Sequence, residues 1–145
     1  MLDLPFICIF EDDAYPCKDL TNKLQTVLDN VPEDCDLLKL GILDCFNKNN
    51  GNIVVNEFLE KNECTYGSHA YVVFKRYYDK YFKNIFKDPV ADCLAMNDKT
   101  SNIYNTIKPL FIQYNQNGIH KNEPIELTIK KYTKEWLLDN FEIEL

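Results

Sequence analysis

Three consecutive carboxylates, Glu11-Asp12-Asp13, come directly after an apolar run from Leu4 to Phe10. Like charges placed side by side repel one another, so such a group is costly unless a cation lies nearby. Mg²⁺ and Mn²⁺ accept one or two carboxylate oxygens and complete their coordination with phosphate and water. The triplet therefore predicts a Mn²⁺ or Mg²⁺ site that also holds the diphosphate of a nucleotide sugar, in which the metal would stabilise the leaving group.

A plainer interpretation of the triplet stays open. Acidic residues favour the start of a helix, where they interact with the helix dipole, so Glu11, Asp12 and Asp13 could form a solvated turn. The same motif of three letters also occurs by chance in unrelated proteins. The position of the triplet at the end of a strand is what favours a site, because open α/β sheets bind ligands at the carboxyl ends of their strands.

The elements that must position this triplet follow from hydrophobic spacing. Leu4 to Phe10 lacks polar alternation and predicts a buried, parallel strand. Leu20, Leu24, Val27 and Leu28 share one face of a helix expected over Lys18 to Leu28. The further expected strands are Asp36 to Leu43, Ile53 to Val55, Gly67 to Phe74 and, within an extended segment from Ile103 to Gln113, Leu110 to Ile112. The further expected helices are Lys75 to Phe86, Val90 to Asn97 and Thr133 to Phe141. Alternating strands and helices predict an α/β chain with one domain over residues 1–145.

Composition narrows the class of protein. The 145 residues carry a net charge of -7, which argues against nucleic-acid binding because that needs a basic face. None of the six Cys residues form a Cys-x-x-Cys pair, so a zinc ribbon is disfavoured and reduced thiols are expected. No apolar run is long enough for a transmembrane helix, and the start does not have the pattern of a signal peptide. We therefore expect a cytoplasmic protein.

Positive charge nevertheless gathers locally. A cluster of this kind indicates either a solvated helix face or a contact with an anionic substrate or membrane surface. The second alternative corresponds to peripheral attachment at the inner membrane. The clustered residues are Lys75, Arg76, Lys80, Lys83 and Lys87, followed by Lys130, Lys131 and Lys134.

Several segments, in order, resemble glycosyltransferase family 25, which includes bacterial lipooligosaccharide glycosyltransferases and collagen galactosyltransferases. The segment from Phe6 to Ala14 resembles the acidic core motif of the family. Asp36 to Gly41 is similar to the strand after its first helix, and Gly67 to Val73 to its Gly-Thr-x-Ala-Tyr segment. The remaining similar segments are Pro89 to Asp92, Ile103-Tyr104, and Pro109 to Phe111 with Gln113.

This resemblance implies a partial, Rossmann-like GT-A-type fold, a mixed sheet flanked by helices. It implies a hexosyltransferase that moves a sugar, galactose being the one the family suggests, from a nucleotide-sugar donor to a hydroxyl of a surface glycan such as lipooligosaccharide. Asp12 and Asp13 are then expected at the metal, and Glu11 and Asp13 at the donor diphosphate. Members of the family have a further half-domain before the acidic motif, so the chain resembles the C-terminal half of a catalytic domain.

Four other residues are candidates, each with two interpretations. Ser68 and His69 either line the acceptor site or pack within a strand. His120 is either a further metal ligand or an exposed loop residue. Asp92 is either the general base that accepts the proton of the acceptor hydroxyl or a carboxylate at a helix start.

A second hypothesis belongs to a different functional class. The chain could be a truncated, catalytically silent remnant that acts as a binding or interaction module. A half-domain would expose apolar sheet surface, which predicts either a homodimer or association with a complementing N-terminal half.

Overall fold

The computed structural model describes residues 4–41, 53–61, 67, 69–81, 100–113 and 132–143. Its centre is a six-stranded mixed sheet in the order β1-β6-β3-β7-β5-β4. The strands are β1 (Phe6–Phe10), β6 (Ala70–Phe74), β3 (Leu37–Lys39), β7 (Ile103–Thr106), β5 (Leu59–Lys61) and β4 (Ile53–Val54). The expected α/β class with a mixed sheet is confirmed.

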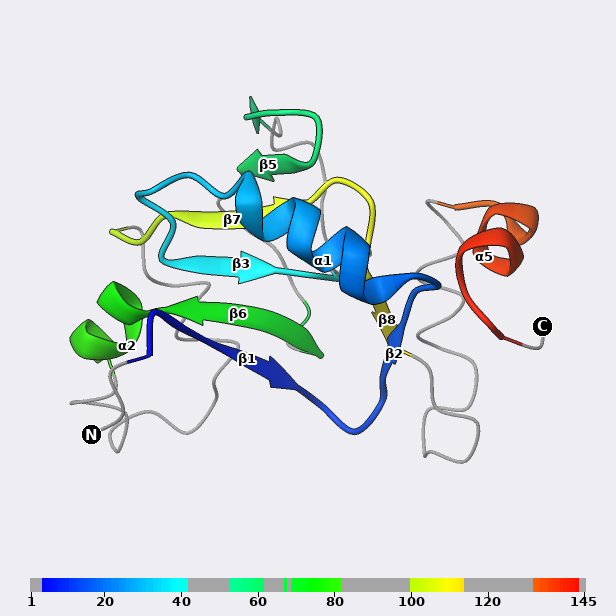
Figure 1. Ribbon diagram of the computed structural model, residues 1–145, viewed down its shortest axis with the longest axis horizontal. Coiled ribbons are helices and arrows are strands. Elements are labelled where there is room, and N and C mark those ends of the chain that lie inside the picture. The colour runs from blue at the N-terminus through cyan, green and yellow to red at the C-terminus, as the bar shows by residue number, and fades with distance from the viewer. Residues whose placement is uncertain are drawn as a thin grey trace.

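The directions of the strands place three carboxyl ends at one edge. β3 and β7 are parallel, and β6 is antiparallel both to β1 and to β3. β1, β3 and β7 therefore run the same way, as their arrows show in Figure 1.

The prediction that β1 is a buried strand with parallel neighbours is wrong. β1 is the outermost of the described strands, its one neighbour in the sheet order is antiparallel, and its burial is only partial.

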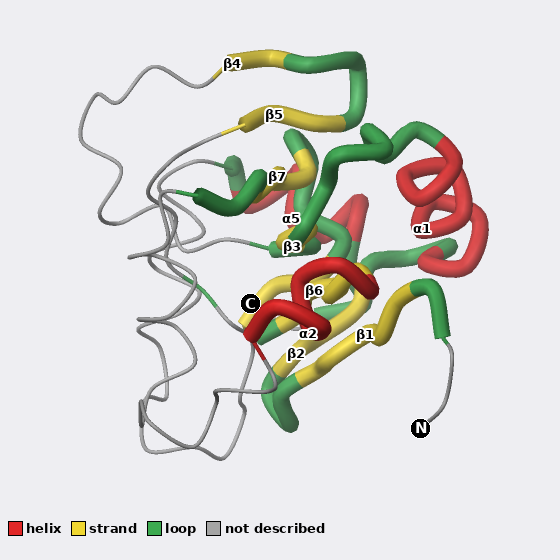
Figure 2. The backbone as a smooth tube through the Cα atoms, turned by 90° about the vertical axis from the view of Figure 1, so that its left-hand side faces the viewer, coloured by secondary structure: helices red, strands yellow, loops and turns green. Residues whose placement is uncertain are grey.

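Helix α1 (Leu20–Asp29) covers one face of this sheet, as Figure 2 shows from the side. Val27 is buried, and Leu20, Leu24 and Leu28 pack against the main core, as their spacing predicts. The helix begins two residues later than expected because Asp19, the residue before it, adopts a left-handed backbone with φ of 56°.

A second, two-stranded sheet follows the acidic triplet. Strand β2 (Ala14–Pro16) pairs antiparallel with β8 (Phe111–Gln113). The segment expected to be one extended stretch is therefore divided between two sheets, with β7 in the large one and β8 in the small one. β2 and β5 are strands that the sequence pattern did not indicate.

Two further helices complete the described chain. α2 (Lys75–Tyr81) follows β6 directly, within the range expected for a helix. α5 (Lys134–Asn140) is capped by Thr133, whose side chain accepts a hydrogen bond from the Trp136 amide. After the helix, Phe141 forms a β-bridge with Cys17. The helix expected over Val90 to Asn97 lies outside the described residues. Of the helices within the described ranges, none is long and apolar enough to cross a membrane.

Two hydrophobic clusters form on opposite faces of the sheet. The larger cluster contains Leu38, Leu40 and Tyr104 together with residues of α1 and α5. The smaller one is formed by Leu37, Val73, Tyr77 and Ile103, with Ile9, Tyr71 and Tyr78 packed against it. The alternation of Leu37 and Leu38 between the clusters follows from the two-residue period of a strand.

Candidate functional site

The acidic triplet forms the turn between β1 and β2, at the carboxyl edge of the sheet. The amide of Ala14 donates to the carbonyl of Glu11 at 3.1 Å, which closes the turn. The amide of Glu11 donates to the carbonyl of His69 at 2.8 Å, so the turn is held against the start of β6. Glu11 and Asp12 are exposed, whereas Asp13 is half-buried. The structure therefore brings two predicted site segments, the triplet and His69, into direct contact.

Asp13 is the best-positioned carboxylate of the three. Gln113 donates from Nε2 to Asp13 Oδ2 at 2.6 Å, because the pairing of β2 with β8 sets Ala14 opposite Gln113. The other oxygen, Oδ1, is inaccessible to solvent and has no hydrogen-bond partner in the described part of the chain. A buried carboxylate oxygen without a donor is costly, so this atom calls for a cation or a proton donor.

His69 lies beside the triplet but is packed. Its side chain is only 1% exposed, and its Nε2 lies 3.4 Å from the carbonyl oxygen of Phe111. A side chain on Gly41, which follows β3, would collide with both that carbonyl and the His69 ring. The close approach needs glycine at this position. Burial favours the interpretation of His69 as a packed strand histidine, and its role toward an acceptor stays a prediction.

Three other predicted site residues, Ser68, Asp92 and His120, lie outside the described residues. Their roles as acceptor contact, general base and metal ligand therefore stay predictions.

A row of buried polar side chains crosses the sheet close to this edge and was not predicted. Register places Lys39, Asn105 and Glu60 side by side on β3, β7 and β5, and the half-buried Tyr71 of β6 continues the row beyond Lys39. Lys39 is 3% exposed, Asn105 0% and Glu60 6%. The sequence carried one signal for it, because Lys39 interrupts an otherwise apolar strand and charged residues are seldom buried without a partner.

The metal prediction can be tested against these side chains. Within the described ranges, no group of three or more His, Cys, Asp or Glu side chains could together hold a metal ion. The described residues therefore do not form a metal site whose ligands all come from protein side chains. Mg²⁺ and Mn²⁺ bound with a diphosphate need only one or two carboxylates, however. Asp13, with one oxygen fixed by Gln113 and the other unpartnered, fits that smaller requirement.

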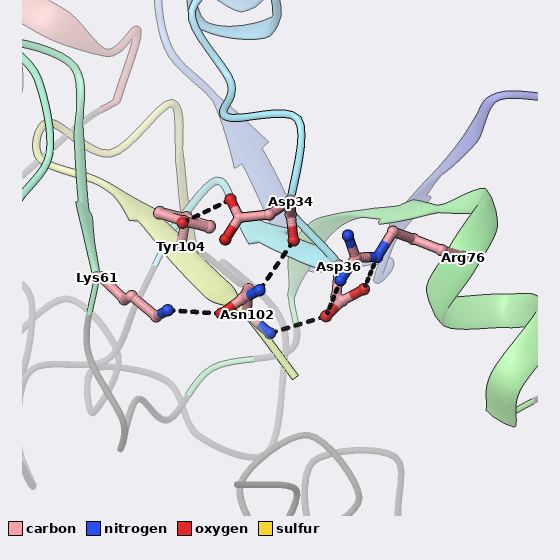
Figure 3. Close-up of polar contacts among 6 residues, drawn as sticks. All are labelled: Asp34, Asp36, Lys61, Arg76, Asn102 and Tyr104. Atoms are coloured by element: carbon pink, nitrogen blue, oxygen red, sulfur yellow. Dashed lines mark hydrogen bonds and ion pairs between the residues drawn. The ribbon is translucent and has the colours of Figure 1, made fainter. Parts of the chain in front are cut away.

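A second acidic segment lies at the opposite edge, at the amino ends of β3 and β7. Figure 3 shows Asp36 facing Arg76 of α2 and the backbone of Asn102. Arg76 Nε lies 2.6 Å from Asp36 Oδ1, and the Asn102 amide donates to Oδ2 at 2.8 Å. The Asp36 side chain is only 7% exposed, and both of its oxygens have partners.

The neighbouring Asp34 extends this network. It accepts a hydrogen bond from the hydroxyl of Tyr104 at 2.9 Å, and Lys61 donates to Asn102 Oδ1 at 2.6 Å. Burial, and after it the hydrogen bond to Asp34, raises the pKa of Tyr104 to about 12. Burial, followed by the charges of Asp36 and Asp34, raises the pKa of the Cys35 thiol. These contacts join β3, β5, β7 and α2, so the network has a structural role.

A pocket of about 390 Å³ lies elsewhere, between α1, the β4–β5 turn and the segment before β8. Its charged lining residues are Asp19, Lys23, Glu57 and Lys108, so both signs are present. None of the predicted site residues lines it.

Comparisons with known proteins found no match for this chain. No protein-family model matches the chain, and neither does any curated protein or solved structure compared with it.

Proposed function

We propose that the chain belongs to a metal-dependent glycosyltransferase of family 25 type. The reaction is transfer of a sugar, with galactose favoured by the resemblance, from a nucleotide-sugar donor to a hydroxyl of a surface glycan such as lipooligosaccharide. The observation that carries the proposal is the contact between Asp13 and Gln113. Both residues lie in segments that carry the family resemblance, 100 positions apart in the sequence, and they meet at the carboxyl edge of the sheet.

The arrangement of the sheet supports a GT-A-type fold for this chain. β1, β3 and β7 run in one direction with β6 reversed between β1 and β3, and α1 covers one face. A ligand held by residues after β1 would also be near the residues that follow β3 and precede β6. Gly41 and His69 occupy those two positions and pack closely together, and among the described residues at this edge the Glu11–Asp13 turn carries the exposed carboxylates.

Each residue then has a stated role. Asp13 holds the metal through its unpartnered oxygen, while Gln113 orients the carboxylate. Asp12 shares the metal, and Glu11 contacts the donor diphosphate together with Asp13. When bound, Mn²⁺ or Mg²⁺ would neutralise the diphosphate that leaves as the acceptor hydroxyl attacks the sugar. The remaining roles are proposed for His120 at the metal, Asp92 as the base that takes the proton, and Ser68 and His69 near the acceptor.

Calorimetry tests this function. Titration of Mn²⁺ into the 145-residue chain, with and without uridine diphosphate, is expected to show binding that tightens when the nucleotide is present. Asp13→Asn is expected to weaken Mn²⁺ binding by at least about tenfold, because a charged ligand is replaced by a neutral one. Asp29→Asn, an exposed carboxylate of α1, is the matched control and should bind as the wild type does. If the wild-type chain binds neither Mn²⁺ nor uridine diphosphate, the proposal is wrong.

A second candidate function is an interaction module without transfer activity. One observation favours it specifically. The outermost strand β1 exposes apolar side chains, with Ile7 37% and Phe10 48% exposed. Binding of neither Mn²⁺ nor nucleotide, combined with self-association or partner capture through β1, would support this alternative over the enzyme.

A further inference from the structure

Strand β1 forms an open edge of the large sheet, since among the described strands it has a neighbour on one side alone. Leu4, just before it, is 43% exposed, and Ile7 and Phe10 are exposed as well. Natural edge strands are usually protected by charge, proline, a bulge or very short length. The opposite edge, β4, is protected by length, because it spans only Ile53–Val54. β1 has five residues, Phe6–Phe10, that include neither a charge nor a proline.

The ladder with β6 determines which backbone groups face outward. The Glu11 amide donates to His69, and the Lys75 amide donates to Pro5, across the same antiparallel register. Hydrogen-bonded positions alternate along such a pair, so the odd-numbered residues of β1 face β6. The amide and carbonyl groups of Phe6, Cys8 and Phe10 therefore point toward the open side.

We infer that β1 is a self-association strand, which pairs antiparallel with β1 of a second copy about a two-fold axis through Cys8. A two-fold axis makes the same surface meet itself, which an antiparallel strand pair satisfies. The register that pairs all five residues sets Cys8 opposite Cys8 of the partner and Phe6 opposite its Phe10. Each of these outward-facing pairs then exchanges two backbone hydrogen bonds.

The side chains suit this register. Phe6 lies opposite the second copy's Phe10, and aromatic cross-strand pairs are among the favourable ones. Between the backbone-bonded pairs, the apolar Ile7 lies opposite the second copy's Ile9. Since no residue within β1 is charged, no like charges are brought together inside the strand pair. A second copy is thus an occupant that matches β1 along its whole length.

Charges at the two ends of β1 also match. Its carboxyl end carries the acidic turn of Glu11 and Asp12, whereas its amino end lies beside Lys75 at the start of α2. In the antiparallel pair, the acidic turn of one copy lies opposite Pro5 of the other. Lys75 of that copy is one strand further away, about 10 Å in total, so the attraction is largely screened at physiological salt and is strongest at low ionic strength. Each copy therefore brings a basic group toward the other's acidic turn.

Sedimentation of the 145-residue chain over a concentration series tests the inference, with proline as the probe. Cys8→Pro removes an amide that points away from β6, so the fold is expected to persist while the dimer weakens by at least about tenfold. Cys8→Ala, which keeps the amide, is the matched control and should still dimerise. A monomeric wild type at every concentration, or a Cys8→Pro chain that dimerises like the control, would overturn the inference.

Hydrogen exchange of the wild type gives a second measurement that needs no variant. As concentration rises, protection is expected to increase at the amides of Phe6, Cys8 and Phe10. The amides of Ile7 and Ile9, which face β6, are expected to be protected at all concentrations. Dimerisation without this alternation would place the interface elsewhere and refute the role of β1.

Discussion

The two ends of the sheet each carry an acidic segment, and the two segments are built differently. At one end, Asp36 is buried and both of its oxygens are occupied, by Arg76 and by the Asn102 amide. At the other end, Asp13 has one oxygen fixed by Gln113 and one oxygen that is buried without a partner in the described part of the chain. Both segments contain clustered acidic residues, so composition alone does not distinguish them.

We propose that this difference separates a structural carboxylate, Asp36, from a ligand-binding one, Asp13. A buried charge is tolerated when its partners are supplied by the fold, and its removal then damages the fold. A carboxylate with an unfilled oxygen costs stability in the absence of a ligand, which is typical of binding sites. The comparison predicts that substitutions at the Asp36 end affect stability, whereas those at the Asp13 end affect binding.

The largest effect is expected for Arg76→Ala. It leaves the carboxylate of Asp36 buried with the Asn102 amide as its one remaining partner among the described residues. Breaking a buried pair costs about 3 kcal/mol, and because the Arg76 side chain is 53% exposed and water can partly replace it, the loss should be at most that value. Urea denaturation would measure the loss. Lys75→Ala is the control on the same helix, because it removes an exposed ion pair with Asp79 and should cost no more than about 0.5 kcal/mol. Equal effects of the two changes would show that the Asp36 pair is not a structural clamp.

Tyr104→Phe is expected to have a smaller effect, about 1 kcal/mol at neutral pH, because it removes the hydrogen bond to Asp34. The effect should depend on pH. The unfolded phenol loses its proton near its ordinary pKa of 10, whereas in the folded chain the pKa is raised to about 12. The native state binds more protons between these values, so stability is retained below pH 10 and lost as the pH rises toward 12.

Denaturation of both chains across that window measures this dependence. Phenylalanine does not titrate, so the stability advantage of the wild type over Tyr104→Phe is expected to shrink as the pH is raised above 10. An advantage that stays constant up to pH 12 would contradict the burial and hydrogen bonding of this hydroxyl.

Much of the secondary structure was predictable because local spacing determines it. The face of α1 formed by Leu20, Leu24 and Val27 follows from a helical period, and β3 follows from a short apolar run. β5 was missed because Leu59-Glu60-Lys61 is short and mostly polar, and its burial comes from pairing with β7. β1 was wrongly expected to be buried, because an apolar edge strand has the same composition as a central parallel one.

The candidate site was predictable only in part. The position of the Glu11–Asp13 turn after a strand could be predicted from the chain order, but its contact with His69 at the start of β6 could not. The bonds from Gln113 to Asp13 and from Arg76 to Asp36 could not, because they join residues 100 and 40 positions apart. Such contacts arise from sheet order and register, and a single sequence carries little information about either.

The smallest effect on stability is expected for Asp13→Asn, even though the same exchange at Asp36 should be costly. Asparagine keeps an oxygen that can accept from Gln113 and replaces a buried, unpartnered carboxylate oxygen with a neutral group, so the change should stay within about 0.5 kcal/mol. Asp36→Asn loses the charge that pairs with Arg76 and should cost about 2 kcal/mol. Urea denaturation of the two variants compares one chemical change at two ends of one sheet. If Asp13→Asn destabilised the chain as much as Asp36→Asn, Asp13 would be a structural carboxylate too. The proposed metal site would then lose its main support, which is the carboxylate oxygen without a partner in the described part of the chain.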